Sequence, residues 1–253
     1  MRKVAVIGGS RLSAMQNLSI THSTTVKTPY GEPSAPLSYG LLGGQEVVYM
    51  PRRGGATEGV PPHKINYRAN IWALRDAGVQ HVIATNSVAS LSLDHAIGDI
   101  VIPDQLIDYT YGRESTFFGD ESSVSLIKFA DPYSEALRNE AITFAHKLNI
   151  EVIGRGTFAI TQGPRFETKA EIARIESDGC DLVGMTGMPE AALARELDLK
   201  YISVTLVVRR AAGRDEGLNL KDPKIQSRLK EQERNIEKLI EAMICHGMPM
   251  MDS

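Results

Sequence analysis

The chain has 253 residues, which is enough for one large α/β domain with a substantial core. Its formal net charge of −3 gives no reason to expect nucleic acid or an anionic membrane as a partner. The two cysteines lie far apart without the spacing of metal ligands, which favours reduced thiols in the cytoplasm. No stretch approaches the length of a membrane span, and the apolar run near the N-terminus is expected to be a strand rather than a signal peptide.

The first predicted strands end in turns that can bind an anion. Residues 3–7 form an apolar strand, and the turn Gly8-Gly9-Ser10-Arg11 can hold phosphate through backbone N–H groups. The turn lacks the glycine patterns of dinucleotide and P-loop sites, which argues against a nicotinamide cofactor or ATP. Residues 28–40 predict a loop, with an edge strand as an option. A strand over 46–50 then ends at Arg52-Arg53, which either binds an anion or forms a solvated basic turn.

The middle of the chain alternates helices and strands. A helix is predicted over 64–77, because apolar residues recur on one face and a glycine follows it. A strand over 79–85 is followed by the small polar residues Asn86 and Ser87. The pattern continues with a strand over 98–103 and a helix over 134–148.

Residues 157–194 hold two strand ends with an unusual set of side chains. A buried strand over 157–160 stops at a Gly-Pro turn and exposes Phe166 and Glu167. A helix with Thr168 as its N-cap follows, and a second strand over 181–185 ends at Met185 and Thr186. Ligands of α/β sheets bind at such strand ends, beside helix N-termini.

The last part of the chain predicts one strand and one helix. The strand over 200–208 is highly apolar and stops at Arg209, and the helix over 223–245 has one apolar face. Strands alternate with helices throughout, and no linker, repeat or low-complexity tract divides them. The sequence therefore predicts a single α/β domain over residues 1–253.

Seven segments in this order resemble the trimeric purine nucleoside phosphorylases, most of all the 5′-methylthioadenosine and 5′-methylthioinosine phosphorylase branch. The resemblance covers the chain from about residue 3 to about residue 215. The matching segments are residues 8–10, 28–36 (TPYGEPSAP), 66–78 (NYRANIWALRDAG), 98–110 (GDIVIPDQLIDYT), 161–168 (TQGPRFET), 183–199 (VGMTGMPEAALARELDL), and 207–208 with 211–213.

The resemblance implies a central mixed β-sheet flanked by helices, in a homotrimer or a dimer of trimers. It implies a glycosyltransferase of the pentosyl class that works in cytoplasmic purine salvage, with neither nucleic acid nor membrane as a partner. Inorganic phosphate, the co-substrate, attacks C1′ of a purine nucleoside and yields the free base and a sugar 1-phosphate. No metal or organic cofactor takes part. The reaction needs an anion held close to the sugar and a stabilised negative charge on the departing base.

The resemblance also implies roles for individual residues. Glu167 accepts a hydrogen bond from N1 of a 6-oxopurine, and Phe166 stacks on the base. Met185 lies under the ribose as an adaptable apolar floor. The residues implied at the phosphate are Ser10, Arg52, Arg53, Asn86, Ser87 and Thr186.

Three arginines depart from the family pattern. Arg11 stands where the family usually has glycine, Arg53 where it has histidine, and Arg209 where it has a base-recognising Asp or Asn. A milder change is Ala89 in place of glycine. Arg11 either faces solvent, adds positive charge for phosphate or an anionic 5′ group, or fills the phosphate site.

Arg209 has two interpretations that the sequence leaves open. Its guanidinium can donate to O6 and N7 of a 6-oxopurine, and so work with Glu167 as a catalytic residue that stabilises the leaving base. It cannot be a general acid at neutral pH, because arginine keeps its proton. Alternatively, Arg209 pairs with Glu167 and fills the base pocket.

The sequence thus supports three hypotheses. The first is phosphorolysis of purine nucleosides with a preference for 6-oxopurines, 5′-methylthioinosine among the candidate substrates. The second is a diverged homologue that binds a purine or a phosphorylated ligand without phosphorolysis. The third is hydrolysis of an N-glycosidic bond, and only the first requires phosphate.

Overall fold

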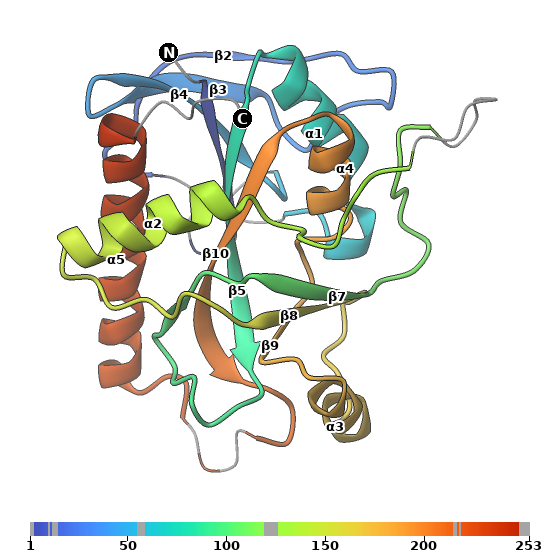
Figure 1. The fold of residues 1–253 in the computed structure, drawn as a ribbon, viewed down its shortest axis with the longest axis vertical. Coiled ribbons are helices and arrows are strands. Elements are labelled where there is room, and N and C mark those ends of the chain that lie inside the picture. The colour runs from blue at the N-terminus through green and yellow to red at the C-terminus, as the bar shows by residue number, and fades with distance from the viewer. Residues whose placement is uncertain are drawn as a thin grey trace.

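A ten-stranded mixed sheet forms the centre of the molecule (Figure 1). The computed structural model describes residues 3–9, 11, 15–54, 59–118, 126–214, 217 and 219–247. The strand order is β2-β3-β4-β1-β5-β9-β8-β7, and β10 pairs with β5 and β6. The strands are β1 (Val4–Gly8), β2 (Ser19–Thr24), β3 (Leu37–Leu42), β4 (Gln45–Pro51), β5 (His81–Ser90), β6 (Ile100–Val101), β7 (Gln105–Tyr109), β8 (Thr157–Thr161), β9 (Leu182–Gly184) and β10 (Lys200–Arg210).

Helices cover the sheet, as Figure 1 shows. Helix α2 packs on α5, and α1 packs on α4 on the other side of β10 and β5. The helices are α1 (Tyr67–Asp76), α2 (Glu135–Lys147), α3 (Lys169–Ser177), α4 (Glu190–Glu196) and α5 (Pro223–His246), and a 3-10 turn (Pro62–Lys64) precedes α1. None of the helices within the described ranges is long and apolar enough to span a membrane.

Alternation along the strands divides the core into two layers. In β1, Ala5 and Ile7 pack with α1 and α4, whereas Val4 and Val6 pack with α2 and α5. Successive side chains of a strand point to opposite faces, so one apolar strand contributes to both layers. The predicted α/β class with a central mixed sheet is confirmed.

Strand β5 loses one neighbour and gains another along the same edge. Strand β10 pairs with β5 over the whole length of β5. Strands β1 and β9 therefore share the other edge of β5. Strand β1 pairs with residues 81–84 and β9 with residues 89–90. The edge of β5 between these positions is therefore open to side chains and loops, and such switch points are where α/β sheets bind ligands.

Several predicted boundaries were wrong. Residues 19–24 and 37–42 pair as antiparallel strands; the sequence predicted a loop with an optional edge strand over 28–40 and no strand over 19–24. Every residue of β2 is exposed, so no apolar alternation marks it. Strand β5 continues to Ser90, so Asn86 and Ser87 lie within it and not after it. Strand β10 likewise continues through Arg209 to Arg210.

Candidate active site

A pocket of about 300 Å³ opens at the switch point beside β5. Strand β5 forms its floor, and the turns after β1, β4 and β9 and the end of β10 form its walls. Eight of the predicted site residues line it, namely Arg52, Arg53, Asn86, Ser87, Phe166, Met185, Thr186 and Arg209. Glu167 lines a neighbouring cavity of about 210 Å³. Ser10 lies outside the described residues.

The turn after β1 approaches β5 closely. The Gly9 N–H donates to Thr85 Oγ1 at 3.0 Å. A Cβ at Gly9 would lie 2.8 Å from the Thr85 carbonyl oxygen, which is closer than real Cβ contacts allow. Glycine is therefore required where this turn meets the strand.

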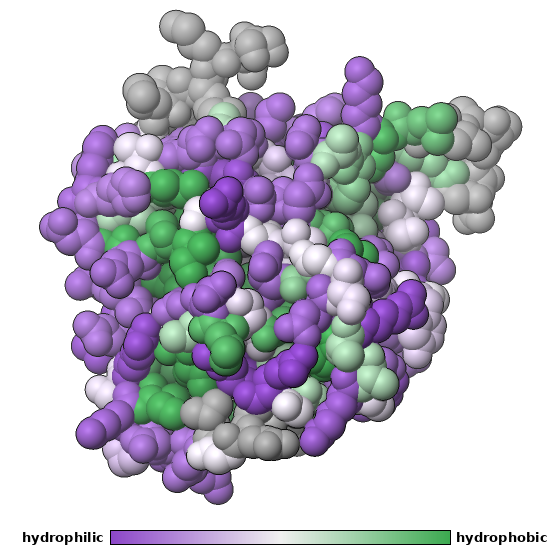
Figure 2. Space-filling view, turned by 60° about the horizontal axis from the view of Figure 1, so that its bottom comes forward, coloured by the Kyte–Doolittle hydropathy of each residue, from purple (hydrophilic) through white to green (hydrophobic). Residues whose placement is uncertain are grey.

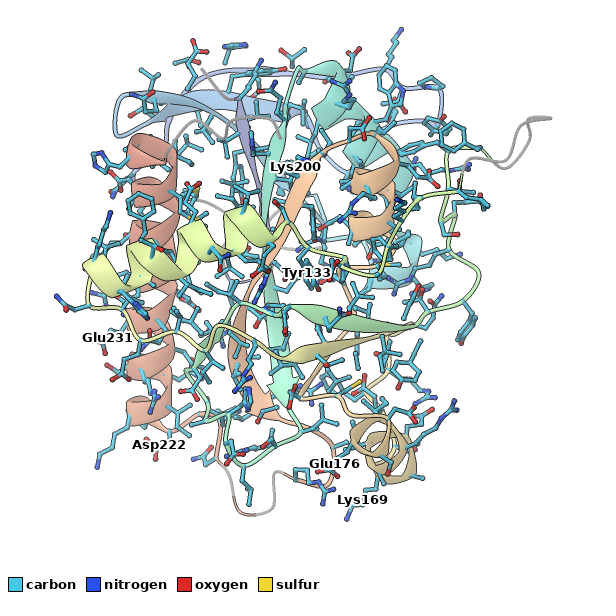
Figure 3. The ribbon with its side chains drawn as sticks, viewed as in Figure 1. Tyr133, Lys169, Glu176, Lys200, Asp222 and Glu231 are labelled. Carbon is cyan, nitrogen blue, oxygen red and sulfur yellow. The ribbon has the colours of Figure 1, made fainter. Side chains whose placement is uncertain are left out.

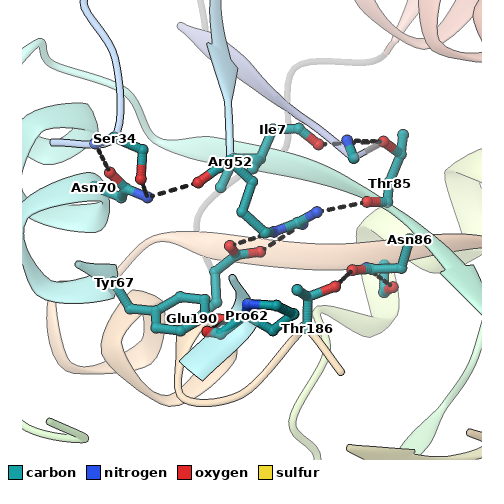
Figure 4. A network of polar contacts seen from close by, with 12 residues as sticks. Ile7, Ser34, Arg52, Pro62, Tyr67, Asn70, Thr85, Asn86, Thr186 and Glu190 are labelled. Atoms are coloured by element: carbon teal, nitrogen blue, oxygen red, sulfur yellow. Dashed lines mark hydrogen bonds and ion pairs between the residues drawn. The ribbon is translucent and has the colours of Figure 1, made fainter. Parts of the chain in front are cut away.

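Arg52 is held in a buried polar network below the pocket (Figure 4). Its Nε and Nη2 donate to the two carboxylate oxygens of Glu190 at 2.7 and 2.8 Å, and its Nη1 donates to the Thr85 carbonyl at 2.8 Å. Arg52 is 1% exposed and Glu190 is 0% exposed. Burial alone lowers the pKa of the Arg52 guanidinium, but the Glu190 carboxylate outweighs burial and raises it.

Two of the segments that carry the resemblance meet at Arg52. Asn70 of α1 accepts from the Ser34 backbone N–H at 2.8 Å and donates to Ser34 Oγ at 3.0 Å. It also donates to the Arg52 backbone carbonyl at 3.5 Å. The loop over 28–36 and helix α1 thus fix the backbone of Arg52 together.

The other arginines that depart from the family pattern have different surroundings. Arg53 Nε donates to the Val60 carbonyl at 2.8 Å, so part of its guanidinium holds the loop before α1. Arg11 forms an ion pair with Glu233 of α5 at 2.6 Å. Arg11 is not among the residues lining the pocket, and its charge is paired at the outer helix layer.

Hydrogen bonds fix the amide of Asn86 on the floor of the pocket. Thr186 Oγ1 donates to Asn86 Oδ1 at 2.7 Å, and Asn86 Nδ2 donates to Ser203 Oγ at 2.8 Å. These bonds tie β5 to the turn after β9 on one side and to β10 on the other. Ser87 of β5 and Met185, which follows β9, line the pocket beside them.

Arg209, Phe166 and Glu167 form a cluster at the other end of the pocket. The guanidinium carbon of Arg209 lies 4.1 Å from the centre of the Phe166 ring. Its Nη2 lies 3.8 Å from Glu167 Oε2. Glu167 Oε1 accepts from Thr161 Oγ1 at 2.7 Å, whereas Oε2 is buried without a hydrogen-bond partner among the described residues. A bulge at Val208 breaks the register of β10 just before Arg209.

Sequence reasoning missed Arg113, which ties together the two turns that carry Phe166 and Thr186. Its Nη2 donates to the carbonyls of Thr161 at 3.1 Å, Gln162 at 2.9 Å and Met185 at 3.0 Å. Its Nη1 donates to the Met188 carbonyl, and burial lowers its pKa. It also donates to Gln162 Oε1 at 3.0 Å and to the Tyr67 hydroxyl at 3.2 Å. Four of its acceptors are backbone carbonyls, which carry no sequence signal.

We expect Arg113→Met to lower the free energy of unfolding by about 3 kcal/mol, because several buried carbonyls lose their donor. Urea denaturation measures the change. The control is Arg155→Met, since Arg155 is an exposed arginine, and its substitution should stay within about 0.5 kcal/mol. Equal effects of the two substitutions would show that Arg113 does not stabilise the turns.

Comparisons with known proteins identify the family of this chain. The family model described as the phosphorylase superfamily matches residues 3–244. The probable S-methyl-5′-thioinosine phosphorylase of Pseudomonas syringae pv. tomato is 47% identical over 215 residues, which cover 85% of this chain and 87% of that protein. The 6-oxopurine nucleoside phosphorylase of Pyrococcus furiosus is 42% identical over 250 residues, with 96% and 92% covered.

Solved structures show the same fold. The methylthioadenosine phosphorylase from Schistosoma mansoni in complex with adenine superposes with a TM-score of 0.89 at 31% sequence identity. The match covers 96% of this chain and 91% of that one. Because the family model spans residues 3–244 and the relatives align over most of their own length, the chain belongs to the phosphorylase superfamily.

Proposed function

We propose that the protein catalyses phosphorolysis of purine nucleosides and prefers 6-oxopurine bases, with 5′-methylthioinosine among its substrates. A phosphate oxygen forms a bond to C1′ while the bond from C1′ to N9 breaks. The electron pair leaves on the purine, which takes up a proton from solvent. Relatives named as methylthioinosine and 6-oxopurine nucleoside phosphorylases support this chemistry.

The observation that carries the base preference is the state of Glu167 Oε2, which pairs loosely with Arg209 Nη2 at 3.8 Å but accepts no hydrogen bond among the described residues. This oxygen is buried. A buried acceptor left without a donor is costly, so a ligand that brings one is favoured. N1 of a 6-oxopurine carries a hydrogen, whereas N1 of adenine is itself an acceptor. The arrangement therefore favours hypoxanthine or guanine over adenine.

The phosphate end of the pocket suits a tetrahedral anion. Among the described residues, the hydrogen bonds to Glu190 and Thr85 occupy three of the five N–H donors of Arg52, and we assign the other two to a ligand. Arg53, Ser87 and Thr186 line the same pocket. We assign these residues, with Asn86 and Ser10, to phosphate, and we place Met185 under the ribose and Phe166 against the base.

Base release measured by chromatography tests the proposal. Inosine, guanosine, adenosine, methylthioinosine and methylthioadenosine are each incubated with and without phosphate. We expect hypoxanthine and guanine to appear only with phosphate, and the 6-oxopurine nucleosides to react about 100-fold faster than the adenosines. Release that persists without phosphate would identify a hydrolase instead.

One observation favours a second candidate, a homologue that binds a ligand without phosphorolysis. Arg209 lies on the Phe166 ring, where a purine would stack. If Arg209 keeps this position, the base subsite is closed to nucleosides. In that case the folded protein releases no base from any of the five substrates.

We propose that phosphate is a co-substrate and that no metal or organic cofactor is needed. No group of three or more His, Cys, Asp or Glu side chains is placed to hold a metal within the part of the chain that the structure describes. Dialysis against EDTA is expected to leave turnover unchanged. A loss of activity that Mg²⁺ or Zn²⁺ restores would contradict this.

We also propose a cytoplasmic homotrimer or dimer of trimers, each protomer one domain over residues 1–253. Hydrophobic patches interrupt the hydrophilic face in Figure 2. Large apolar side chains exposed on the protomer include Leu126 at 90%, Leu93 at 83% and Tyr111 at 74%. Exposed apolar surface of this kind favours subunit contacts. Native mass spectrometry distinguishes a monomer from these assemblies.

A further inference from the structure

We propose that Tyr201, which does not line the pocket, is a positioning residue that sets the affinity of Arg52 for phosphate through Glu190. The inference rests on the proposed phosphorolysis. Tyr201 lies near the start of β10, whereas the pocket lies at the opposite end of that strand. A single chain of hydrogen bonds joins the two places.

Glu190 is the middle member of this series of hydrogen bonds. Its Oε1 accepts from the Tyr201 hydroxyl at 2.7 Å and from Arg52 Nη2 at 2.8 Å, and its Oε2 accepts from Arg52 Nε at 2.7 Å. Arg52, Glu190 and Tyr201 are all at most 2% exposed. Water therefore cannot replace a lost partner, and the carboxylate plane sets the plane of the guanidinium.

The Tyr201 hydroxyl affects Arg52 in two ways. It fixes the rotation of the Glu190 carboxylate, and it withdraws part of the negative charge that would otherwise act on Arg52 alone. Without the hydroxyl, Glu190 holds Arg52 more strongly and in a less defined orientation. The remaining N–H donors of Arg52 are then held less well in place for an anion in the pocket, so phosphate binding weakens.

The chain supplies a matched control for this hydroxyl. Tyr133 stacks on Tyr201 with ring centres 6.2 Å apart and is 3% exposed. Its hydroxyl is buried without a hydrogen-bond partner among the described residues. Both tyrosines line a third cavity of about 450 Å³. Figure 3 labels Tyr133 and Lys200, which also lines this cavity. Tyr201→Phe and Tyr133→Phe thus each remove one buried hydroxyl, but only the Tyr201 hydroxyl belongs to the series of hydrogen bonds that reaches Arg52.

Steady-state kinetics of the purified full-length chain, with phosphate and inosine varied separately, test the inference. We expect Tyr201→Phe to raise the KM for phosphate about tenfold, which corresponds to about 1.4 kcal/mol. The KM for inosine should stay within about twofold, and Tyr133→Phe should change neither constant by more than that. Isothermal titration with inorganic phosphate gives the same comparison without turnover.

The outcomes separate this inference from the proposed function. If the wild type needs phosphate but both variants behave alike, the role of Tyr201 is wrong and the phosphorolysis stands. A rise in both KM values, or a fall in kcat alone, would also contradict a role confined to phosphate. If the wild type neither binds phosphate nor depends on it, the proposed function fails and this inference fails with it.

Discussion

Replacing Arg52 with methionine is expected to lower the free energy of unfolding by about 3–5 kcal/mol and to abolish phosphate-dependent turnover. The Glu190 carboxylate is 0% exposed, and both of its oxygens accept from Arg52. Removal of the guanidinium leaves a buried charge whose remaining hydrogen-bond partner, among the residues that the structure describes, is the Tyr201 hydroxyl. The loss of stability comes from that uncompensated charge, and the loss of activity from the missing phosphate ligand.

The double variant Arg52→Met with Glu190→Gln separates these two effects. Glutamine keeps an acceptor for the Tyr201 hydroxyl but carries no charge, so urea denaturation should show most of the lost stability restored. Turnover should remain absent. If the double variant is as unstable as Arg52→Met, the buried charge of Glu190 is not the cause. If Arg52→Met retains phosphate-dependent turnover, Arg52 does not bind the anion.

The convergence of the predicted residues could be foreseen, because it depends on strand ends. Arg52, Asn86, Thr186 and Arg209 each lie at or near the end of an apolar strand. Strands β4, β5 and β10 run parallel with β1 in one sheet, so the carboxyl ends that carry Arg52, Asn86 and Arg209 meet at one edge. Thr186 follows β9, which pairs antiparallel with β5, so this rule does not account for its place in the pocket. The family resemblance then added a role for each residue.

The partners of these residues could not be foreseen, because they depend on long-range packing. Arg52 and Glu190 are 138 positions apart, and nothing in a turn of two arginines indicates a buried carboxylate beneath it. Glu190 was recognisable only as the acidic first residue of a helix, where acids are common for electrostatic reasons. Arg11 likewise pairs with Glu233, which lies 222 positions further along the chain.

The position of Asn86 shows why strand ends were misplaced. The apolar run of β5 ends at Thr85, so the sequence predicted that the strand stops there. Pairing with β10 nevertheless continues through Ser90. Small polar residues remain in the strand because the opposite edge is open to the pocket over 85–88. A polar interruption of a strand can therefore mark a site as well as a boundary.

Arg209→Asn is expected to reduce kcat/KM for inosine by about 10- to 100-fold. In the proposed complex the guanidinium leaves the Phe166 ring and donates to O6 and N7 of the base, and a bidentate arginine contact of this kind contributes about 1–3 kcal/mol. Asparagine is shorter and lacks the charge that stabilises the departing base. Arg209→Lys keeps the charge without the planar fork, so it should show an intermediate rate.

Arg210→Asn is the matched control for Arg209→Asn. Arg210 is the next residue, but its Nη1 donates to Ser90 Oγ and to the Ser92 carbonyl, and it does not line the pocket. Its substitution should leave kcat/KM for inosine within about threefold. If Arg209→Asn instead raises the rate while Arg210→Asn does not, Arg209 blocks the base subsite. The contact of Arg209 with the Phe166 ring at 4.1 Å would then close the base subsite, and the protein would not be a phosphorylase.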